Sequence, residues 1–334
     1  MKQFFAMLLA LVLVLSVMLP ALAEEQAEDG EIDWEALLAL VSDRGEHYWD
    51  FTATGQPLEK KYTALGEHEV EYAEFALADE QAQKMEVWYP ADPNDQESWP
   101  VVIFVNGTGA KASGYQANFR HMASWGFIAV GNEDENTRTG ASAEATLTKL
   151  LSENENPDSV LYGKIDPARI GLTGHSQGGV GVFNAAAKQP HGSQYAALFT
   201  VSGTSPYWGQ EGVFGLDWAY DLTDIHVPVF MGAGTGYFDA GTADSFEATE
   251  GQGICPLWAL EMNFQALPDT IVKGYARKAD IDHGDTLNGF DGYMTAWFLW
   301  HLCGDGEAAQ VYTGENPELA QNSLYQDVVI DAEE

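Results

Sequence analysis

Apolar and polar positions along the chain follow two periods, one typical of strands and one typical of helices. The run Val101–Val105 is apolar at every position, which is typical of a parallel strand that is buried on both faces. Elsewhere apolar residues recur three or four positions apart, as they do on one face of a helix. The predicted strands are Glu69–Leu77, Lys84–Tyr89, Val101–Val105, Gly126–Val130, Arg169–Thr173, Ala196–Val201, Val227–Met231 and Thr270–Tyr275. The predicted helices are Ile32–Ser42, Tyr115–Trp125, Ala141–Ser152, Gly179–Lys188 and Phe290–Leu302.

Strands that alternate with helices predict an α/β fold with one doubly wound, mostly parallel sheet of about eight strands. Residues 62–304 contain no internal repeat and no long linker, so we expect one domain there. Residues 24–61 are predicted to form an acidic extension with a short helix, and residues 305–334 an acidic tail. The stretch between Val201 and Val227, about 25 residues, is too short for a large helical cap domain.

The first residues have the pattern of an export signal. Lys2 precedes an apolar run from Phe4 to Leu19, and Ala21-Leu22-Ala23 has the small-x-small form of a cleavage site. The alternative is an N-terminal anchor helix, but the apolar run is short for crossing a bilayer. We therefore expect residues 1–23 to be a signal peptide, and the protein to be secreted or periplasmic without stable membrane insertion.

Composition excludes several classes of protein. The chain has 334 residues, of which 46% are apolar and 12% aromatic, so it is not a disordered chain. Its 15 Lys and Arg residues stand against 51 Asp and Glu residues, and the formal net charge of −36 makes nucleic acid an unsuitable partner. No loop has the EF-hand spacing, and His68-Glu69 lacks the second His of a zinc-protease motif. We expect a monomer without metal or cofactor.

Two cysteines are too few for a disulfide scaffold or a cysteine-rich metal site. Export would permit one bridge, and Cys255 and Cys303 are the pair available for it. The alternative is two buried free thiols.

The strongest chemical signal is Gly174-His-Ser-Gln-Gly178, a G-x-S-x-G motif. It follows the predicted strand Arg169–Thr173 and opens the predicted helix Gly179–Lys188, which is the strand–turn–helix setting that a nucleophilic serine requires. The turn is tight, so the positions on either side of the serine must be small. Ser176 is therefore predicted to be a nucleophile at the carboxyl end of a strand, where open α/β sheets place their sites.

A serine needs a base and an acid, which in this architecture follow it along the chain in the order acid, then His. His226 lies at a strand entrance and His301 within the last helix, so His283, in the loop after the last predicted strand, is the predicted base. Asp239 is the first carboxylate after the strand Val227–Met231 and is the predicted acid.

Other carboxylates lie near these positions in the sequence. Asp244 and Glu247 remain alternatives for the acid. Asp280 and Asp282, which flank His283, are predicted to be solvated loop residues.

An ester or amide carbonyl also needs two N–H donors for its oxyanion. Gln177, the residue after the nucleophile, is predicted to supply one of them. The loop Asn106-Gly-Thr-Gly109 follows the apolar strand and is predicted to supply the other, from Thr108 or alternatively from Gly109.

At these residues the chain resembles an α/β-hydrolase. It is most similar to the capless branch of cutinases, polyester (polyethylene-terephthalate) hydrolases and dienelactone-hydrolase-like esterases. The segments that carry the resemblance are Met85–Pro90, Asn106–Ala110, Ala123–Val130, Gly174–Gly179 and Asp282–Gly284 with Trp297. The resemblance implies hydrolysis of carboxylic esters through an acyl-enzyme. It also implies a substrate-stacking aromatic residue near Trp208, for which packing of a surface loop is the alternative.

One departure from that branch concerns the acid. The branch carries an aspartate about where Gly236 stands, so Asp239 requires a longer loop. We expect a secreted serine esterase with an open cleft that suits bulky or polymeric esters. A peptidase or acyltransferase on the same Ser-His-Asp residues, or an inactive binding protein on this fold, are the alternatives.

Overall fold

The computed structural model describes residues 44–91 and 98–332. The chain forms two units, Met1–Thr52 and Ala53–Glu334. In the described part of the first unit, the short 3-10 helix η1 (Tyr48–Asp50) is followed by a turn that is closed by a hydrogen bond from Thr52 Oγ1 to the Tyr48 carbonyl (2.9 Å). The predicted signal peptide and the predicted helix Ile32–Ser42 lie outside the described residues.

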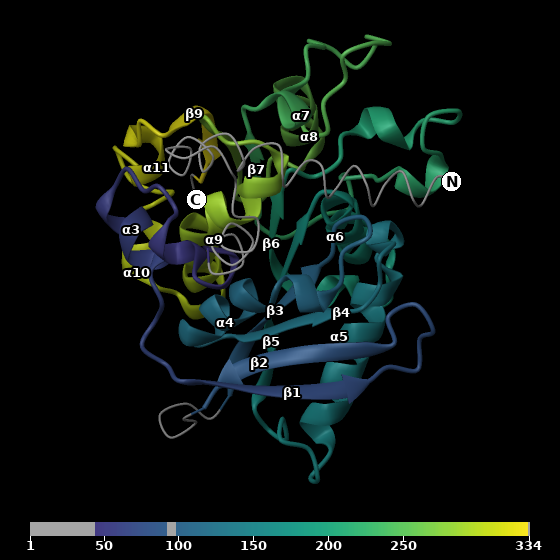
Figure 1. Ribbon diagram of the computed structural model, residues 1–334, viewed down its shortest axis with the longest axis vertical. Coiled ribbons are helices and arrows are strands. Elements are labelled where there is room, and N and C mark those ends of the chain that lie inside the picture. Colours follow the sequence, from purple (N-terminus) through teal and green to yellow (C-terminus); the bar gives the residue numbers. More distant parts are fainter. Residues whose placement is uncertain (1–43, 92–97, 333–334) are drawn as a thin grey trace, which may run out of the picture. The chain divides into compact units, whose positions relative to one another are not determined.

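A nine-stranded sheet organises the second unit, in the order β1-β2-β4-β3-β5-β6-β7-β8-β9 (Figure 1). Its strands are β1 Val70–Ala76, β2 Lys84–Pro90, β3 Trp99–Val105, β4 Ile128–Asn132, β5 Ile165–His175, β6 Tyr195–Val201, β7 Val229–Gly234, β8 Lys273–Lys278 and β9 Tyr325–Asp331. The pairs from β4 to β8 are parallel, whereas β1–β2, β2–β4 and β8–β9 are antiparallel. The predicted α/β fold with a mostly parallel sheet is confirmed.

Helices cover both faces of this sheet because its central strands are apolar on both sides. In β3, Val101, Ile103 and Val105 face one core and Val102 and Phe104 face the other. The helices of the unit are α3 Pro57–Thr63, α4 Gln116–Ser124, α5 Ala141–Glu155, α6 Gln177–Lys188, α7 Tyr237–Ala240, α8 Leu257–Ala266, α9 Thr286–Cys303, α10 Gly306–Ala309 and α11 Glu318–Gln321. Short 3-10 turns are η2 Ala112–Gly114, η3 Thr137–Thr139, η4 Gly192–Gln194, η5 Pro206–Gly209, η6 Leu216–Trp218 and η7 His283–Asp285.

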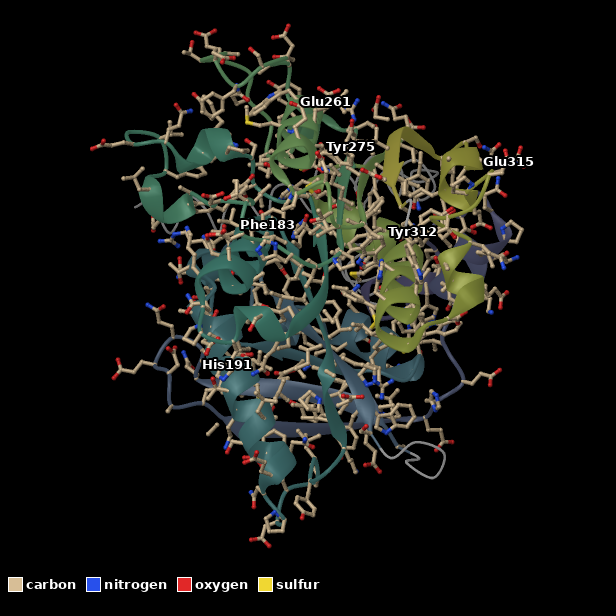
Figure 2. All side chains as sticks on the ribbon, turned by 180° about the vertical axis from the view of Figure 1, so that it is seen from behind. Phe183, His191, Glu261, Tyr275, Tyr312 and Glu315 are labelled. Atoms are coloured by element: carbon tan, nitrogen blue, oxygen red, sulfur yellow. The ribbon has the colours of Figure 1, made fainter. Side chains whose placement is uncertain are left out.

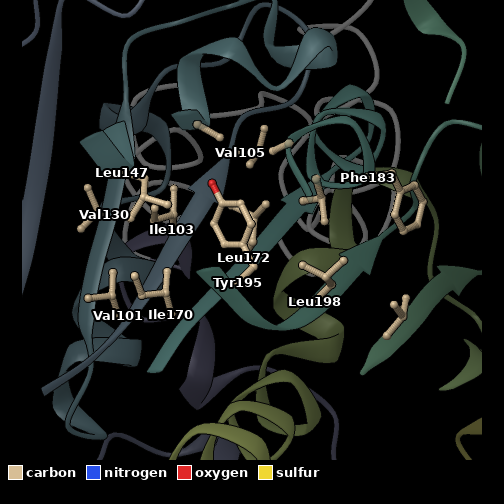
Figure 3. Close-up of a cluster of buried hydrophobic side chains, with 14 of the residues drawn as sticks. Val101, Ile103, Val105, Val130, Leu147, Ile170, Leu172, Phe183, Tyr195 and Leu198 are labelled. Carbon is tan, nitrogen blue, oxygen red and sulfur yellow. The ribbon is translucent and has the colours of Figure 1, made fainter. Parts of the chain in front are cut away.

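Each face has its own set of helices. Figure 3 shows the first core, in which Leu147 of α5 and Phe183 of α6 lie over strand residues such as Ile103 and Leu172. The second core is filled by aromatic residues of α4 and α9, including Phe119 and Trp297. The connection β3–α4–β4 therefore crosses one face of the sheet and β5–α6–β6 crosses the other. Because these strands are parallel, their carboxyl ends lie at one edge.

The C-terminal segment differs from the sequence prediction. Residues 305–334 were expected to form an acidic tail, yet α10, α11 and β9 pack on the body of the unit, and β9 extends the sheet as a ninth strand. Tyr312, which is labelled in Figure 2, has its ring centroid 4.9 Å from that of Trp297 and donates a hydrogen bond to the Tyr293 carbonyl at 2.6 Å. Apolar residues spaced among many carboxylates therefore continue the second core beyond residue 304.

A buried ion pair joins the two ends of this unit. Glu59 of α3 is 1% exposed and its Oε1 lies 2.9 Å from Lys278 Nζ at the end of β8. The same carboxylate accepts hydrogen bonds from Asn322 Nδ2 (2.7 Å) and Tyr325 OH (2.8 Å). Burial lowers the pKa of Lys278, while the Glu59 charge opposes that effect. Although α3 lies before the expected boundary at residue 61, it therefore packs on β8 and the C-terminal segment of this unit.

The predicted bridge between the two cysteines is not formed, and both are free thiols. Cys255 is buried in the first core, whereas Cys303 ends α9, the helix that covers the opposite face of the sheet. The sheet therefore separates the two sulfurs, and burial raises the pKa of the Cys255 thiol.

Candidate active site

Ser176 occupies a strained turn between β5 and α6. Its backbone has φ 59° and ψ −123°, a left-handed conformation that a residue with a side chain adopts only under constraint. A Cβ at Gly174 would lie 2.4 Å from the Gly178 carbonyl oxygen, and a Cβ at Gly178 would lie 2.0 Å from the Val105 carbonyl oxygen. Glycine is thus required at both positions, as the motif predicts.

Backbone hydrogen bonds hold this turn from both sides. The Ser176 N–H donates to the Val201 carbonyl at the end of β6 (3.0 Å). The Ser176 carbonyl accepts from the N–H groups of Gly179 (2.9 Å) and Thr204 (3.2 Å). The side chain of Ser176 is partly exposed at the carboxyl edge of the sheet.

The structure brings His283 and Asp239 together. His283 begins η7 after β8, and Asp239 lies in α7 after β7. His283 Nδ1 is 2.7 Å from Asp239 Oδ1, and the Asp239 side chain is fully buried. Because a carboxylate accepts this bond, the proton of a neutral imidazole lies on Nδ1 and leaves Nε2 as an acceptor. Asp244 and Glu247 are exposed and form no hydrogen bond with His283 in the described part of the chain.

The second oxygen of Asp239 is also satisfied. It accepts hydrogen bonds from Ser202 Oγ (2.5 Å) and from the Gly234 N–H (2.8 Å). The Thr286 hydroxyl lies 2.8 Å from Ser202 Oγ and donates to the His283 carbonyl (2.9 Å). Neither Ser202 nor Thr286 belongs to a motif that was predicted from the sequence. Their position at the carboxyl end of β6 and the start of α9 is the signal that could have indicated them.

His175 links the nucleophile turn to the base. Its ring centroid is 4.6 Å from that of His283, and its Nε2 is 2.8 Å from the His283 carbonyl oxygen. A carbonyl can only accept, so His175 carries its proton on Nε2. Burial, assisted by the nearby His283, lowers the pKa of His175 to about 4. His175 is therefore a neutral donor at neutral pH. Because it directly precedes Ser176 in the chain, its contacts hold the His283 loop next to the nucleophile turn.

The loop after β3 faces the same turn. A Cβ at Gly107 would lie 3.3 Å from His175 Nδ1, and the Asn106 side chain holds the loop through the carbonyls of Asn132 (2.7 Å) and Asp134 (2.9 Å).

The backbone N–H groups of this loop differ in whether they already donate a hydrogen bond within the protein. The N–H of Gly107 donates to Tyr115 OH (3.0 Å), that of Gly109 to the Glu135 carbonyl (3.0 Å) and that of Ala110 to the Gly107 carbonyl (3.1 Å). Among the four amides 107–110, only Thr108 N–H lacks an acceptor within the described part of the chain. This favours Thr108 over Gly109 as a donor to a ligand. Gln177 is the first residue of α6, so its N–H has no intrahelical acceptor.

Trp208 lies in η5, after β6. Its indole N–H donates to the Gly253 carbonyl (3.0 Å) and its ring stacks on Phe214 at 4.7 Å. Phe214 is 51% exposed and contacts Trp218 at 4.9 Å. Trp208 thus takes part in loop packing and still presents a partly exposed face.

Asp282 corrects one sequence prediction. It was expected to be a solvated loop residue, but its carboxylate accepts hydrogen bonds from three backbone N–H groups, those of Phe238, Asp239 and His283. Asp280, two residues earlier, is exposed as expected.

The described residues offer neither a metal site nor a membrane-spanning helix. Among the described residues, no group of three or more His, Cys, Asp or Glu side chains is arranged to hold a metal ion. In the same part of the chain, no helix has both the length and the apolar character needed to cross a bilayer.

Part of the chain is similar to known proteins. Residues 63–208 match the family described as PET hydrolase-like, PETase. The chain is 26% identical over 160 residues to chlorophyllase-1, a chloroplastic protein of Citrus unshiu. That alignment covers 43% of this chain and 45% of the chlorophyllase, so the chain spans less than half of the length of this relative.

The matched residues 63–208 contain β1 to β6, the loop after β3 and the Ser176 turn. His283 and Asp239 lie beyond this match, and the structure places them at the same edge of the sheet. The nine-stranded, mostly parallel sheet and the Ser176 turn have the arrangement of the α/β-hydrolase fold, and residues 63–208 are similar to the PET hydrolase-like branch of that superfamily.

Proposed function

We propose that the protein is a serine hydrolase that cleaves carboxylic esters through an acyl-enzyme. The observation that carries the proposal is the 2.7 Å hydrogen bond from His283 Nδ1 to the buried Asp239, beside the strained Ser176 turn. The matches to a PET hydrolase-like family and to a chlorophyllase support an ester as the substrate rather than a peptide.

The reaction follows from the proton positions. Neutral His283 accepts the hydroxyl proton of Ser176 on Nε2 while Oγ attacks the ester carbonyl. Asp239 keeps the Nδ1 tautomer and stabilises the imidazolium. Backbone N–H groups of Thr108 and Gln177 donate to the oxyanion. His283 then protonates the leaving alcohol, and a water molecule activated by the same histidine releases the acid from Ser176.

We propose an open cleft for bulky or polymeric esters. The connection between β6 and β7 contains only the short turns η5 and η6 and no long helix that would cover the site. Trp208 and Phe214 lie in this connection and offer aromatic surface for an acyl or aryl group. Export before action, with cleavage near Ala23, is part of the same proposal.

The experiment has two arms. A fluorophosphonate probe should label the purified protein at Ser176 and leave Ser176→Ala unlabelled. A chain-length series of p-nitrophenyl esters, a polyester film, an acetylated polysaccharide and a peptide substrate should then be compared, and we expect hydrolysis of the esters. Peptide cleavage without ester cleavage would favour a peptidase. Equal labelling of both variants would remove Ser176 as the nucleophile.

A further inference from the structure

The Asp282 carboxylate joins the segment that carries the acid to the segment that carries the base. Its Oδ2 accepts the Phe238 N–H (3.0 Å), and its Oδ1 accepts the N–H groups of Asp239 (2.9 Å) and His283 (2.8 Å). Phe238 and Asp239 lie within α7, whereas His283 begins η7. One side chain therefore fixes the backbone at both partners of the His283–Asp239 hydrogen bond.

Gly236 provides the space that this carboxylate occupies. A Cβ at Gly236 would lie 2.3 Å from Asp282 Cγ and 2.4 Å from Asp282 Cβ, closer than atoms of this kind approach each other. The backbone of Gly236 has φ −65° and ψ 163°, which any residue adopts, so glycine is required here for space and not for conformation. Its N–H donates to the Ile281 carbonyl (2.9 Å), which holds the two segments side by side.

We propose that Asp282 is a positioning residue for the proposed hydrolase. We also propose that position 236 must be glycine because a side chain there would displace the Asp282 carboxylate. The inference rests on the proposed function, because it assigns to Asp282 the alignment of Asp239 with His283. Asp282 acts through backbone amides and does not contact the reacting atoms. Its loss lets α7 and η7 move relative to each other, so that the imidazole is no longer aimed at Ser176.

The charged and titratable groups around His283 come from several elements. Asp239 faces it from α7, His175 from β5, and Asp282 and Asp285 belong to its own loop. Burial and the neighbouring Asp282 charge raise the pKa of Asp285. A charge effect of Asp282 must therefore be separated from its hydrogen bonds, and Asp280→Asn provides the control. Asp280 is exposed, carries the same charge two residues away, and has φ 61°, which asparagine tolerates.

The kinetic test uses Asp282→Ala, Asp282→Asn, Gly236→Ala and the double variant, with a p-nitrophenyl ester as substrate. A small misplacement of a catalytic group costs about 100-fold in rate, so we expect kcat of Asp282→Ala to fall by about 10- to 100-fold. KM should change by less than about twofold, because substrate contacts are untouched.

The other variants test the geometry. Asp282→Asn keeps one oxygen for two of the three amides and should retain more activity than Asp282→Ala. Gly236→Ala should resemble Asp282→Ala, and the double variant should be no worse than either, because both changes remove the same interaction. Asp280→Asn should match the wild type. A wild-type kcat for Asp282→Ala, additive losses in the double variant or an equal loss in Asp280→Asn would each overturn the proposal.

A second measurement does not depend on turnover. Backbone amide exchange at Phe238 and Asp239, and the downfield NMR signal of the His283 Nδ1 proton, should be observed in the wild type and weakened in Asp282→Ala and Gly236→Ala. Unchanged exchange and an unchanged signal would overturn the positioning role. If the wild type hydrolyses no ester, the proposed function fails by itself, and these two signals still decide whether Asp282 holds Asp239 against His283.

Discussion

At Asp239 three hydrogen bonds meet on one buried carboxylate, from His283, Ser202 and the Gly234 N–H. This arrangement fixes the imidazole tautomer and supplies the negative charge that an imidazolium needs. Asp239→Asn keeps the shape but offers an amide that favours the wrong tautomer.

We therefore expect Asp239→Asn to lower kcat by about 10⁴-fold, as expected when a triad acid loses its charge. Asp244→Asn, a change of the same kind at an exposed residue in the same loop, should leave kcat within about twofold, because an exposed carboxylate without a contact contributes little. Steady-state kinetics on a p-nitrophenyl ester measure both. Similar small losses in the two variants would place the acid elsewhere.

His301 gives a pH prediction at the same scale. Its ring packs at 4.2 Å from Trp297 and 4.0 Å from Trp300, and burial lowers its pKa to about 3. Between its ordinary pKa of 6.5 and about 3, the unfolded chain binds a proton that the folded chain does not, so folded-state stability falls as the pH falls through this range.

We expect His301→Gln to weaken the dependence of unfolding free energy on pH between about 6.5 and 4, whatever its effect at neutral pH. Urea unfolding at a series of pH values measures this slope. Parallel curves for the wild type and the variant would show that His301 is protonated in the folded protein.

Some residues of the candidate site could be predicted from the sequence, and others could not. Ser176 and His283 were predictable because their motifs lie where strands end, and Asp239 because it is the first carboxylate after β7. Asp282 was not, since its role depends on a cavity at Gly236 that is 46 positions earlier in the chain. The catalytic roles themselves remain predictions until variants are measured.

At the scale of elements, periodicity predicts the strands and helices of the core but not those that depend on distant partners. The last parallel strand was expected at Thr270–Tyr275 but runs over Lys273–Lys278. Its two terminal lysines are buried, and Lys273 Nζ is satisfied by the carbonyls of Phe264 (3.2 Å) and Leu267 (2.9 Å). Lysine normally indicates an exposed position, so the sequence pattern placed the strand too early. The acidic residues around β9 concealed that strand in the same way.

The buried ion pair between Glu59 of α3 and Lys278 of β8 gives a prediction at the scale of elements. Glu59→Ala would leave Lys278 buried without its carboxylate partner, so we expect it to lower the free energy of unfolding by about 3–5 kcal/mol. Lys61, on the same helix, pairs with Glu307 at the surface, and Lys61→Ala should cost less than about 1 kcal/mol. Urea unfolding compares the two. Equal small costs would mean that the C-terminal segment is not held through Glu59.

At the scale of the whole molecule, the most distinctive property is the large negative net charge. The chain carries −36, and removal of residues 1–23, which include Lys2 and no acidic residue, leaves 14 basic against 51 acidic residues, or −37. A field of this sign keeps the protein soluble and repels anionic substrates and surfaces.

We expect salt to discriminate between substrates. Raising ionic strength from about 0.01 to 0.15 M shortens the screening length from about 30 to 8 Å, so kcat/KM for a carboxylate-bearing ester should rise. The value for a neutral ester of equal length should stay constant. A rise of the same size for both esters would show that salt acts on the enzyme and not on the encounter.

The central claim is that ester cleavage passes through a covalent acyl group on Ser176. Rapid mixing with a p-nitrophenyl ester, acid quenching and mass spectrometry of the peptide that contains Gly174–Gly178 test it directly. The account predicts a mass increase equal to the acyl group on Ser176 in the wild type, and none in Ser176→Ala. Full ester turnover in Ser176→Ala, or turnover in the wild type with no acylated peptide at any time, would contradict it.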